Sequence, residues 1–132
     1  MKRYPFILFI ATAILFGGRT SAHHSFAATY IENETLAIEG DLVQFLFRNP
    51  HSYMQLVVKE KDGTTIRWAA EWAGTSQLAS SGVVRDSLKV GDHVIITGNP
   101  GRNPEDHRIR LITLRRPKDG FIWGQKPGEV VD

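Results

Sequence analysis

The sequence predicts an all-β fold with one short helix: a five-stranded, partly open barrel whose helix lies between the third and fourth strands. Three observations support this fold class. Five segments carry the apolar residues of β-strands, short turn signals separate the first three, and one helix-like stretch precedes the last two. A strand meander, a helix and two further strands are the element order of the oligonucleotide/oligosaccharide-binding (OB) fold.

The first strand is expected over residues 36–47, LAIEGDLVQFLF, and the second over residues 53–59, YMQLVVK. Both faces of the first strand become apolar toward its end, which indicates a strand that bends between two packed layers. Gly40 is the residue at which a β-bulge would permit that bend. Because Pro50 cannot donate to a strand ladder, the strand ends in the loop RNPHS.

An Asp-Gly pair within KDGT (61–64) predicts a hairpin turn, and its second arm is the third strand, residues 65–72. Strand alternation places Trp68 and Trp72 on the apolar face, so both are expected in the core. Glu71 falls on the opposite face, where an ion pair or solvent is expected, because most charged residues stay exposed.

The helix is expected over residues 75–82, between the third and fourth strands. Thr75 or Ser76 could cap its start, and Gly82 could end it, since hydroxyl residues favour the first position and glycine favours the last.

The last two strands are expected over 93–98 and 107–114, with a loop rich in proline and glycine over 99–106. Residues 115–132 show little periodicity and are expected to pack loosely as a tail. The predicted organisation is therefore a signal peptide, an N-terminal arm, a barrel domain and a C-terminal tail, at residues 1–22, 23–35, 36–114 and 115–132.

The N-terminal residues have the three-part layout of a secretory signal peptide. Lys2 and Arg3 precede an apolar run over residues 6–16, and small residues stand at Thr20 and Ala22. The run is shorter than the ~20 residues that a membrane-spanning helix needs. We therefore expect cleavage after Ala22, export to the periplasm or the medium, and no stable membrane insertion; a retained anchor is the alternative.

Composition narrows the classes of partner. The chain has 16 Lys and Arg against 14 Asp and Glu, but three of the basic residues lie in the predicted signal peptide. The remaining chain is nearly neutral, and its basic residues gather only around the last strand, so nucleic acid is not expected as a partner. There is no cysteine, which excludes disulfides and thiolate metal sites.

Four stretches together resemble an uncharacterised family of small exported bacterial proteins: AHHSFAATY, NPHSY, WAAEW and RDSLKVGDHVIITG. In that family His-His-Ser-Phe follows the signal peptide and Asn-Pro-His closes the first long strand. The resemblance spans roughly residues 22–114. It implies a periplasmic or secreted barrel domain with no assigned activity.

No catalytic motif is found. The chain lacks a Gly-x-Ser-x-Gly elbow, a His-Glu-x-x-His zinc motif, a phosphate-binding glycine loop and a cysteine nucleophile. The sequence therefore predicts an exported, non-enzymatic binding domain for a periplasmic ligand or protein that it does not specify.

A copper site is the first alternative. Cleavage after Ala22 would leave His23 at the N-terminus, where its amine and ring nitrogen could chelate one ion. His51 or His107 would add an imidazole, and a planar nitrogen set suits Cu(II). His24 belongs to the same candidate set. The competing interpretation is that the histidine pair is only a processing boundary and that His51 has a structural role in its loop.

A barrel module for oligosaccharide or protein is the second alternative. Its candidate cleft residues are Asn49, Tyr53, Glu71 and Arg102. With Trp68 and Trp72 assigned to the core, an aromatic stacking platform would depend on Tyr53 and Trp123.

Overall fold

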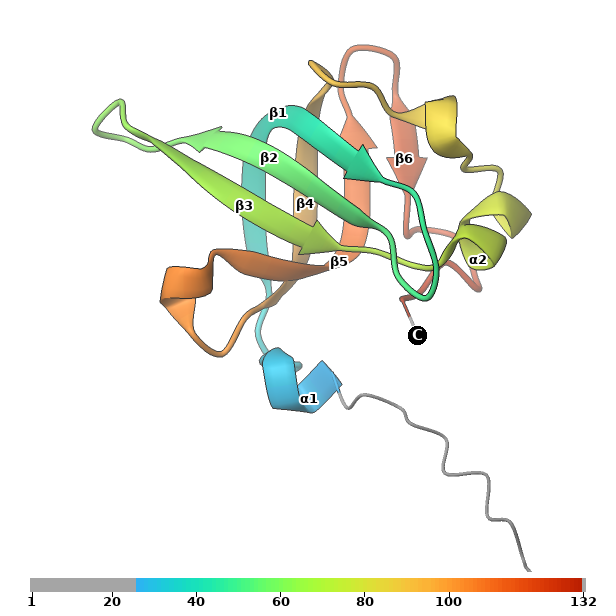
Figure 1. The fold of residues 1–132 in the computed structure, drawn as a ribbon, viewed down its shortest axis with the longest axis horizontal. Coiled ribbons are helices and arrows are strands. Elements are labelled where there is room, and N and C mark those ends of the chain that lie inside the picture. Colours follow the sequence, from blue (N-terminus) through green and yellow to red (C-terminus); the bar gives the residue numbers. More distant parts are fainter. Residues whose placement is uncertain (1–25, 132) are drawn as a thin grey trace, which may run out of the picture.

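Five strands close into a barrel, and a sixth strand continues its sheet (Figure 1). The computed structural model describes residues 26–131. Its helices and strands, in chain order, are α1 (Phe26–Thr29), β1 (Leu36–Leu46), β2 (Tyr53–Lys59), β3 (Thr65–Glu71), α2 (Thr75–Ser80), β4 (His93–Pro100), β5 (Arg108–Arg116) and β6 (Phe121–Trp123). Two short 3₁₀ turns lie at Arg85–Ser87 and Pro104–Asp106.

The strand order confirms the predicted OB-like barrel. Neighbours run β3-β2-β1-β4-β5-β6, and a parallel pairing of β3 with β5 closes the ring. That closing pairing joins three residue pairs, from Ala69 with Arg108 to Glu71 with Arg110. The helix α2 lies between β3 and β4, as expected. The barrel therefore has a short closing seam next to the C-terminal end of β3.

Strand β1 bends as predicted, but its β-bulge is not at Gly40. It pairs with β4 in its first half and with β2 in its second half, and the register shifts between Leu42 and Gln44. Gly40, the predicted bulge residue, is regularly paired on both sides instead. A side chain at Gly40 would collide with the carbonyl oxygen of Val57, so glycine is required there by the close approach of β2.

Of the two tryptophans predicted to lie in the core, one is found there. Trp72 is fully buried and meets Trp123 edge to face, with ring centroids 5.2 Å apart. Helix α2 adds Leu78, which is also fully buried. Trp68 packs against this core but is only partly buried. The prediction that Trp68 is a core residue therefore fails, because β3 pairs with β5 only from Ala69 onward and Trp68 lies just before that closing seam.

The predicted hairpin turn is confirmed at Asp62 and Gly63. Gly63 has a φ of +88°, and the Asp62 carboxylate accepts a hydrogen bond of 2.9 Å from the amide of Thr64. Glycine reaches this left-handed conformation without strain. The turn projects the β2–β3 hairpin away from the barrel (Figure 1).

Helix α2 begins differently from the prediction. Gly74 occupies its N-cap position and no side chain of the helix caps it, so Thr75 and Ser76 are not the cap. Instead, the side-chain oxygen of Asn49 accepts a 2.8 Å hydrogen bond from the amide of Thr75. The cap therefore comes from the β1–β2 loop. Gly82, with a φ of +81°, follows the helix as expected.

The tail is an ordered part of the fold. Strand β5 continues to Arg116, and β6 then pairs with it, which places Trp123 and Val131 in the core. The expectation of a loosely packed tail is wrong because the chain reverses at a turn where Arg116 binds Asp119, with nitrogen and oxygen 2.9 Å apart. The reversal lets a short apolar strand cover the barrel.

The N-terminal arm enters the described residues at α1, which lies below the barrel in Figure 1. Tyr30 is buried and forms a backbone bridge with Gly101. Within residues 26–131 no helix is long and apolar enough to span a bilayer. The predicted signal peptide, His23 and His24 lie outside the described residues.

Candidate functional site

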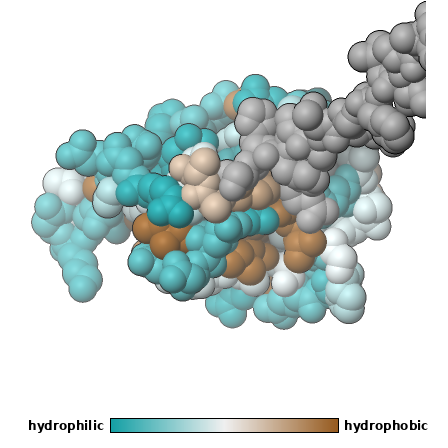
Figure 2. Space-filling model, turned by 90° about the horizontal axis from the view of Figure 1, so that it is seen from below, coloured by the Kyte–Doolittle hydropathy of each residue, from teal (hydrophilic) through white to brown (hydrophobic). Residues whose placement is uncertain are grey.

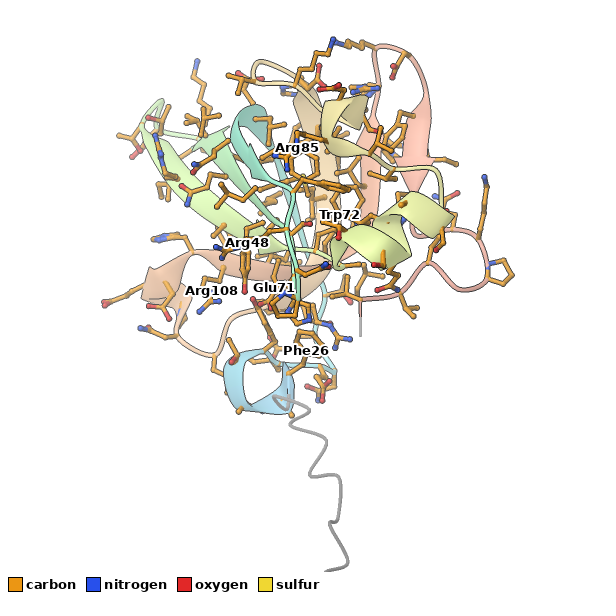
Figure 3. All side chains as sticks on the ribbon, turned by 45° about the vertical axis from the view of Figure 1, so that its right-hand side comes forward. Phe26, Arg48, Glu71, Trp72, Arg85 and Arg108 are labelled. Carbon is orange, nitrogen blue, oxygen red and sulfur yellow. The ribbon has the colours of Figure 1, made fainter. Side chains whose placement is uncertain are left out.

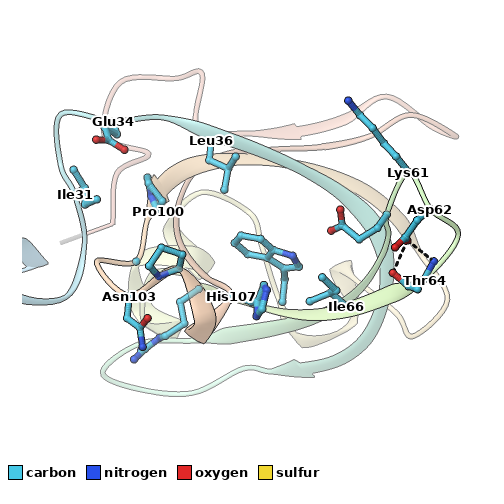
Figure 4. Close-up of a pocket in the computed structure, with 15 residues that line it drawn as sticks. Ile31, Glu34, Leu36, Lys61, Asp62, Thr64, Ile66, Pro100, Asn103 and His107 are labelled. Atoms are coloured by element: carbon cyan, nitrogen blue, oxygen red, sulfur yellow. Dashed lines mark hydrogen bonds between the residues drawn. The ribbon is translucent and has the colours of Figure 1, made fainter.

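A cavity of about 850 Å³ opens between the β2–β3 hairpin and the β4–β5 loop (Figure 4). We call it the Trp68 pocket. Its apolar wall consists of Ile31, Leu36, Ile66, Trp68 and Pro100, and its polar residues include Glu34, Glu60, Lys61, Asp62, Asn103, His107 and Arg108. A volume of this size is typical of sites for small ligands.

The β4–β5 loop holds His107 against Trp68. Their ring centroids are 5.3 Å apart and the ring planes are nearly perpendicular, at 80°. His107 has a φ of +45°, and its carbonyl accepts a 2.9 Å hydrogen bond from the amide of Ala69 on β3. The loop is thereby fixed to the strand that carries Trp68. The wall of the pocket is built from two elements that are joined by backbone bonds.

The ring of Trp68 lines this pocket, while its indole nitrogen is buried. Nε1 is buried and finds no hydrogen-bond partner among the described residues. Buried N–H groups normally have a partner, because an unpaired donor costs roughly 1–3 kcal/mol. Trp72 Nε1, in the core, is in the same condition. Trp68 differs in that its ring lines a cavity that a ligand could enter.

The polar residues of the pocket carry an excess of negative charge. Glu34, Glu60 and Asp62 face only Lys61 and Arg108 as full cations. Arg108 is engaged elsewhere, since its guanidinium lies 3.7 Å from the buried carboxylate of Glu71. Within residues 26–131 neither Glu34 nor Glu60 forms a side-chain salt bridge. The Trp68 pocket is therefore apolar inside and acidic at its edge.

A second group of polar side chains gathers around Glu71, at the closing seam of the barrel (Figure 3). We call Tyr30, His51, Glu71 and Arg108 the Glu71 cluster. The Tyr30 hydroxyl donates to Glu71 Oε2, and His51 Nδ1 lies 2.6 Å from Oε1. The Glu71 side chain is 8% exposed. The buried carboxylate thus joins the N-terminal arm, the β1–β2 loop and β5.

Burial and the Glu71 carboxylate together shape the titration of two tyrosines. Burial raises the pKa of Tyr30 far above its usual value, and the hydrogen bond to Glu71 raises it further. Burial also raises the pKa of Tyr53, with the negative charge of Glu71 as the next cause. Both phenols therefore remain neutral hydrogen-bond donors at physiological pH.

Aromatic rings cover the Glu71 cluster on its outer side. Phe26 stacks on His51 with ring centroids 5.3 Å apart, and the Arg110 guanidinium lies 3.8 Å from the centre of the Phe26 ring. A cavity of about 200 Å³ remains between α1, the β1–β2 loop and β3, and Tyr53 and Glu71 both line it. This cavity is smaller than the usual range for drug-sized ligands.

The family model for DUF6152, a family of unknown function, matches residues 12–110. The chain belongs to DUF6152. The predicted resemblance to an uncharacterised family is thereby confirmed. The comparison with curated proteins finds no match. Among solved structures, the small single-stranded DNA-binding protein from Streptomyces coelicolor matches with 17% identity and a TM-score of 0.43, covering 65% of this chain and 93% of its own.

The four cleft residues predicted for this DUF6152 chain do not form one cleft. Tyr53 and Glu71 share the small cavity, whereas Asn49 caps α2 and Arg102 binds the N-terminal arm through the Ala27 carbonyl, at 2.5 Å. Of the two alternatives expected for Glu71, the ion pair is found, with Arg108 and His51, whereas solvent exposure is wrong, because Glu71 is buried and also accepts a hydrogen bond from Tyr30.

The predicted copper ligands fall in two places. His51 belongs to the Glu71 cluster, whereas His107 lines the Trp68 pocket, so they border different cavities on either side of β3. His23 and His24 lie outside the described residues, and residues 26–131 hold no group of three histidines or carboxylates suited to a metal. Copper binding by this DUF6152 chain stays a prediction.

The tryptophan available for stacking on a ligand is Trp68 rather than the predicted Trp123. Trp123 is buried, and its indole nitrogen donates a 3.0 Å hydrogen bond to Ser81, so it cannot stack on a ligand. Trp68 is partly exposed and lines the pocket instead. Sequence reasoning also missed Tyr30 and Arg108, although Tyr30 lies within the AHHSFAATY stretch that carries the family resemblance.

Proposed function

We propose that the protein is an exported, non-enzymatic binding domain whose ligand enters the Trp68 pocket. The observation that carries this proposal is the pocket itself: about 850 Å³ of space and an apolar wall that includes a partly exposed tryptophan. Binding sites are typically concave and mostly apolar, with a few polar groups that fix orientation.

The contacts of the Glu71 cluster connect segments of the fold. A His–carboxylate pair such as His51 and Glu71 could orient a general base. In this chain the two carboxylate oxygens of Glu71 join different segments, one contacting His51 of the β1–β2 loop and the other Tyr30 of the N-terminal arm. The neighbouring Ser52 hydroxyl donates to the Arg48 carbonyl and belongs to a separate contact. The cluster attaches the arm to the barrel, and we assign it a structural role.

A neutral fluorescent probe, N-phenyl-1-naphthylamine, tests the pocket. We expect its emission to rise on binding the protein and to be excited by energy transfer from tryptophan. Ile66→Arg should remove the signal by filling the pocket, while Ile122→Arg, on the partly exposed surface of β6, should leave it unchanged. Melting curves check that both variants fold. Equal binding by both folded variants, or no binding by the wild type, would overturn this function.

The proposed export has its own test. The layout of residues 1–22 supports cleavage after Ala22. Protein recovered from the cell envelope should therefore yield the N-terminal sequence His-His-Ser-Phe. Uncleaved chain in the membrane fraction would contradict export of a cleaved, freely diffusing domain.

Cu(II) binding is the second candidate function, and two contacts favour it. Glu71 holds Nδ1 of His51, the arrangement in which a carboxylate fixes the ring of a metal-binding histidine. Phe26 stacks on His51 and follows His24 by two residues. A residue of extended chain spans at most about 3.6 Å, so both N-terminal histidines are within reach of His51 by chain length.

Calorimetric titration of copper distinguishes this candidate from a processing boundary. The cleaved protein should bind one equivalent, and an extra N-terminal Met should weaken binding strongly because it blocks the His23 amine. His51→Ala should also weaken binding, and His107→Ala should not. His93→Ala serves as the control, since His93 contacts Asp41 and Glu39 on another face. Equal, weak binding by all proteins would refute the copper site.

A further inference from the structure

We propose that the Trp68 pocket selects an organic cation: an amine or quaternary ammonium group joined to an apolar body. The inference rests on the proposed function, because it names the ligand class of the same pocket. It follows from the charges around the pocket and from the aromatic ring inside it, which favour the same chemistry by independent physical effects.

The first effect is the negative field at the edge of the pocket. Glu34 and Asp62 are exposed carboxylates and Glu60 is half-buried, and Lys61 is the cation that remains after Arg108 is paired with Glu71. Clefts lined by one sign of charge concentrate ligands of the opposite sign. Each of these carboxylates attracts a cation only weakly, because solvent screens its charge. The three together favour a cation over a neutral or anionic ligand.

The second effect is cation attraction by an aromatic face. Tryptophan is the best of the three aromatic residues for this interaction, and a cation within about 6 Å of its ring centre gains roughly 0.5–2 kcal/mol. Trp68 is the tryptophan that lines the pocket, and Ile66 and Leu36 provide apolar surface beside it. The positive charge of such a ligand would be attracted by the carboxylates at the edge and by the ring of Trp68, and its apolar body would pack against the wall of the pocket.

The same charges disfavour a polyanion. The phosphates of a nucleic acid would have to approach Glu34, Glu60 and Asp62 with Lys61 as the one cation of the pocket that forms no ion pair among residues 26–131. Two basic residues at and just after the end of β5, Arg116 and Lys118, are both bound to Asp92, away from the pocket. A neutral sugar, which the aromatic wall could also accept, is the main competitor and is separated by experiment.

Three probes of one carbon skeleton test the charge preference: 2-phenylethylamine as the cation, 2-phenylethanol as the neutral compound and phenylacetate as the anion. Nuclear magnetic resonance follows the indole N–H signal of Trp68, assigned with Trp68→Phe. We expect the amine to shift this signal with a dissociation constant of about 1 mM or below, a realistic value for a ligand of this size. The alcohol should bind more weakly, and phenylacetate should bind least.

Paired variants test the role of the carboxylates. Glu34→Gln with Glu60→Gln should weaken the amine about three- to tenfold at low salt and leave the alcohol unchanged. The matched control, Glu39→Gln with Asp86→Asn, also removes two carboxylates, both exposed, but neither lines the pocket. It should leave the affinity for the amine nearly unchanged.

The outcomes separate this inference from the proposed function. If the alcohol or a disaccharide such as cellobiose binds as tightly as the amine, the cation preference is wrong and the pocket still binds ligands. If the amine binds but both double variants weaken it equally, the carboxylates of the pocket are not its cause, and the inference also fails. If neither the amine nor the neutral naphthylamine probe shifts the Trp68 signal, the proposed function fails with it.

Discussion

At the scale of single residues, Glu71 is where the N-terminal arm meets the barrel. Its carboxylate accepts a hydrogen bond from the Tyr30 hydroxyl and pairs with His51 and Arg108. These three residues belong to three different segments of the chain. Moving a charged carboxylate out of water is costly, so it persists in the interior only when hydrogen bonds compensate it. Removing the carboxylate would leave the buried Tyr30 hydroxyl without its acceptor.

Glu71→Ala should therefore lower the free energy of unfolding by about 2–3 kcal/mol, the typical cost of a stranded buried polar group. Glu71→Gln should cost less, because the amide oxygen can still accept one hydrogen bond. Arg67→Ala, an exposed residue on the same strand, should change stability by less than about 0.5 kcal/mol. Urea denaturation measures all three, and an unchanged Glu71→Ala variant would contradict the assigned role.

The residues that sequence reasoning misplaced share one cause. Alternation along residues 65–72 correctly buries Trp72, which follows β3 directly, but it treats each residue as part of an ideal strand with one solvent-exposed face. Glu71 lies at the strand end, where Tyr30 covers it from a distant segment. Trp68 lies before the closing seam, where β5 no longer covers the strand. Local periodicity predicts neither the contact of Tyr30 with Glu71 nor the missing β5 neighbour beside Trp68.

At the scale of elements, the cap of α2 shows how a loop and a helix depend on each other. Asn49 reaches across from the β1–β2 loop to the Thr75 amide, and Gly74 leaves room for it, since a side chain there would collide with the Pro50 carbonyl. The sequence predicted the existence and end of the helix. Its cap could not be found in the helix sequence, because the capping side chain is 26 residues away in the chain.

Asn49→Ala should therefore cost about 1 kcal/mol of stability, the usual cost of a lost N-cap. Ser76→Ala, which changes the residue that sequence reasoning proposed as a cap, should cost nearly nothing, because Ser76 is exposed and no side chain of the helix caps it. Thermal melting compares the two variants. A larger loss for Ser76→Ala than for Asn49→Ala would contradict the observed cap.

At the scale of the whole molecule, the barrel itself was predictable, whereas its closure depends on the far end of the chain. Strand lengths, the hairpin turn and the position of the helix follow local rules. The additional strand β6 has three residues and gives no periodic signal, yet it pairs with β5 and buries Trp123. What holds this end together is a charge network around Asp92, which local patterns do not reveal.

Asp92 connects the start of β4 to the turn between β5 and β6. Burial disfavours its charged form, but hydrogen bonds from Lys118, the Lys89 amide and Arg116 outweigh burial and lower the pKa of Asp92 to about 2. Lys118 Nζ and Arg116 Nη1 each lie 2.7 Å from a carboxylate oxygen. Because the folded state holds the carboxylate ionised, this network stabilises the fold above the unfolded pKa near 3.8 and loses its effect as the pH falls toward 2.

We therefore expect Asp92→Asn to lower the free energy of unfolding by about 2 kcal/mol between pH 5 and 7, from the difference between the two pKa values. The gap between wild type and variant should narrow as the pH falls from about 4 to about 2, because the wild-type carboxylate becomes protonated there. Asp86→Asn, which removes an exposed carboxylate nearby, is the control and should leave the profile unchanged. Urea denaturation at a series of pH values measures these curves. A gap that stays constant down to pH 2 would show that Asp92 stabilises the protein by packing or neutral hydrogen bonds rather than by its charge.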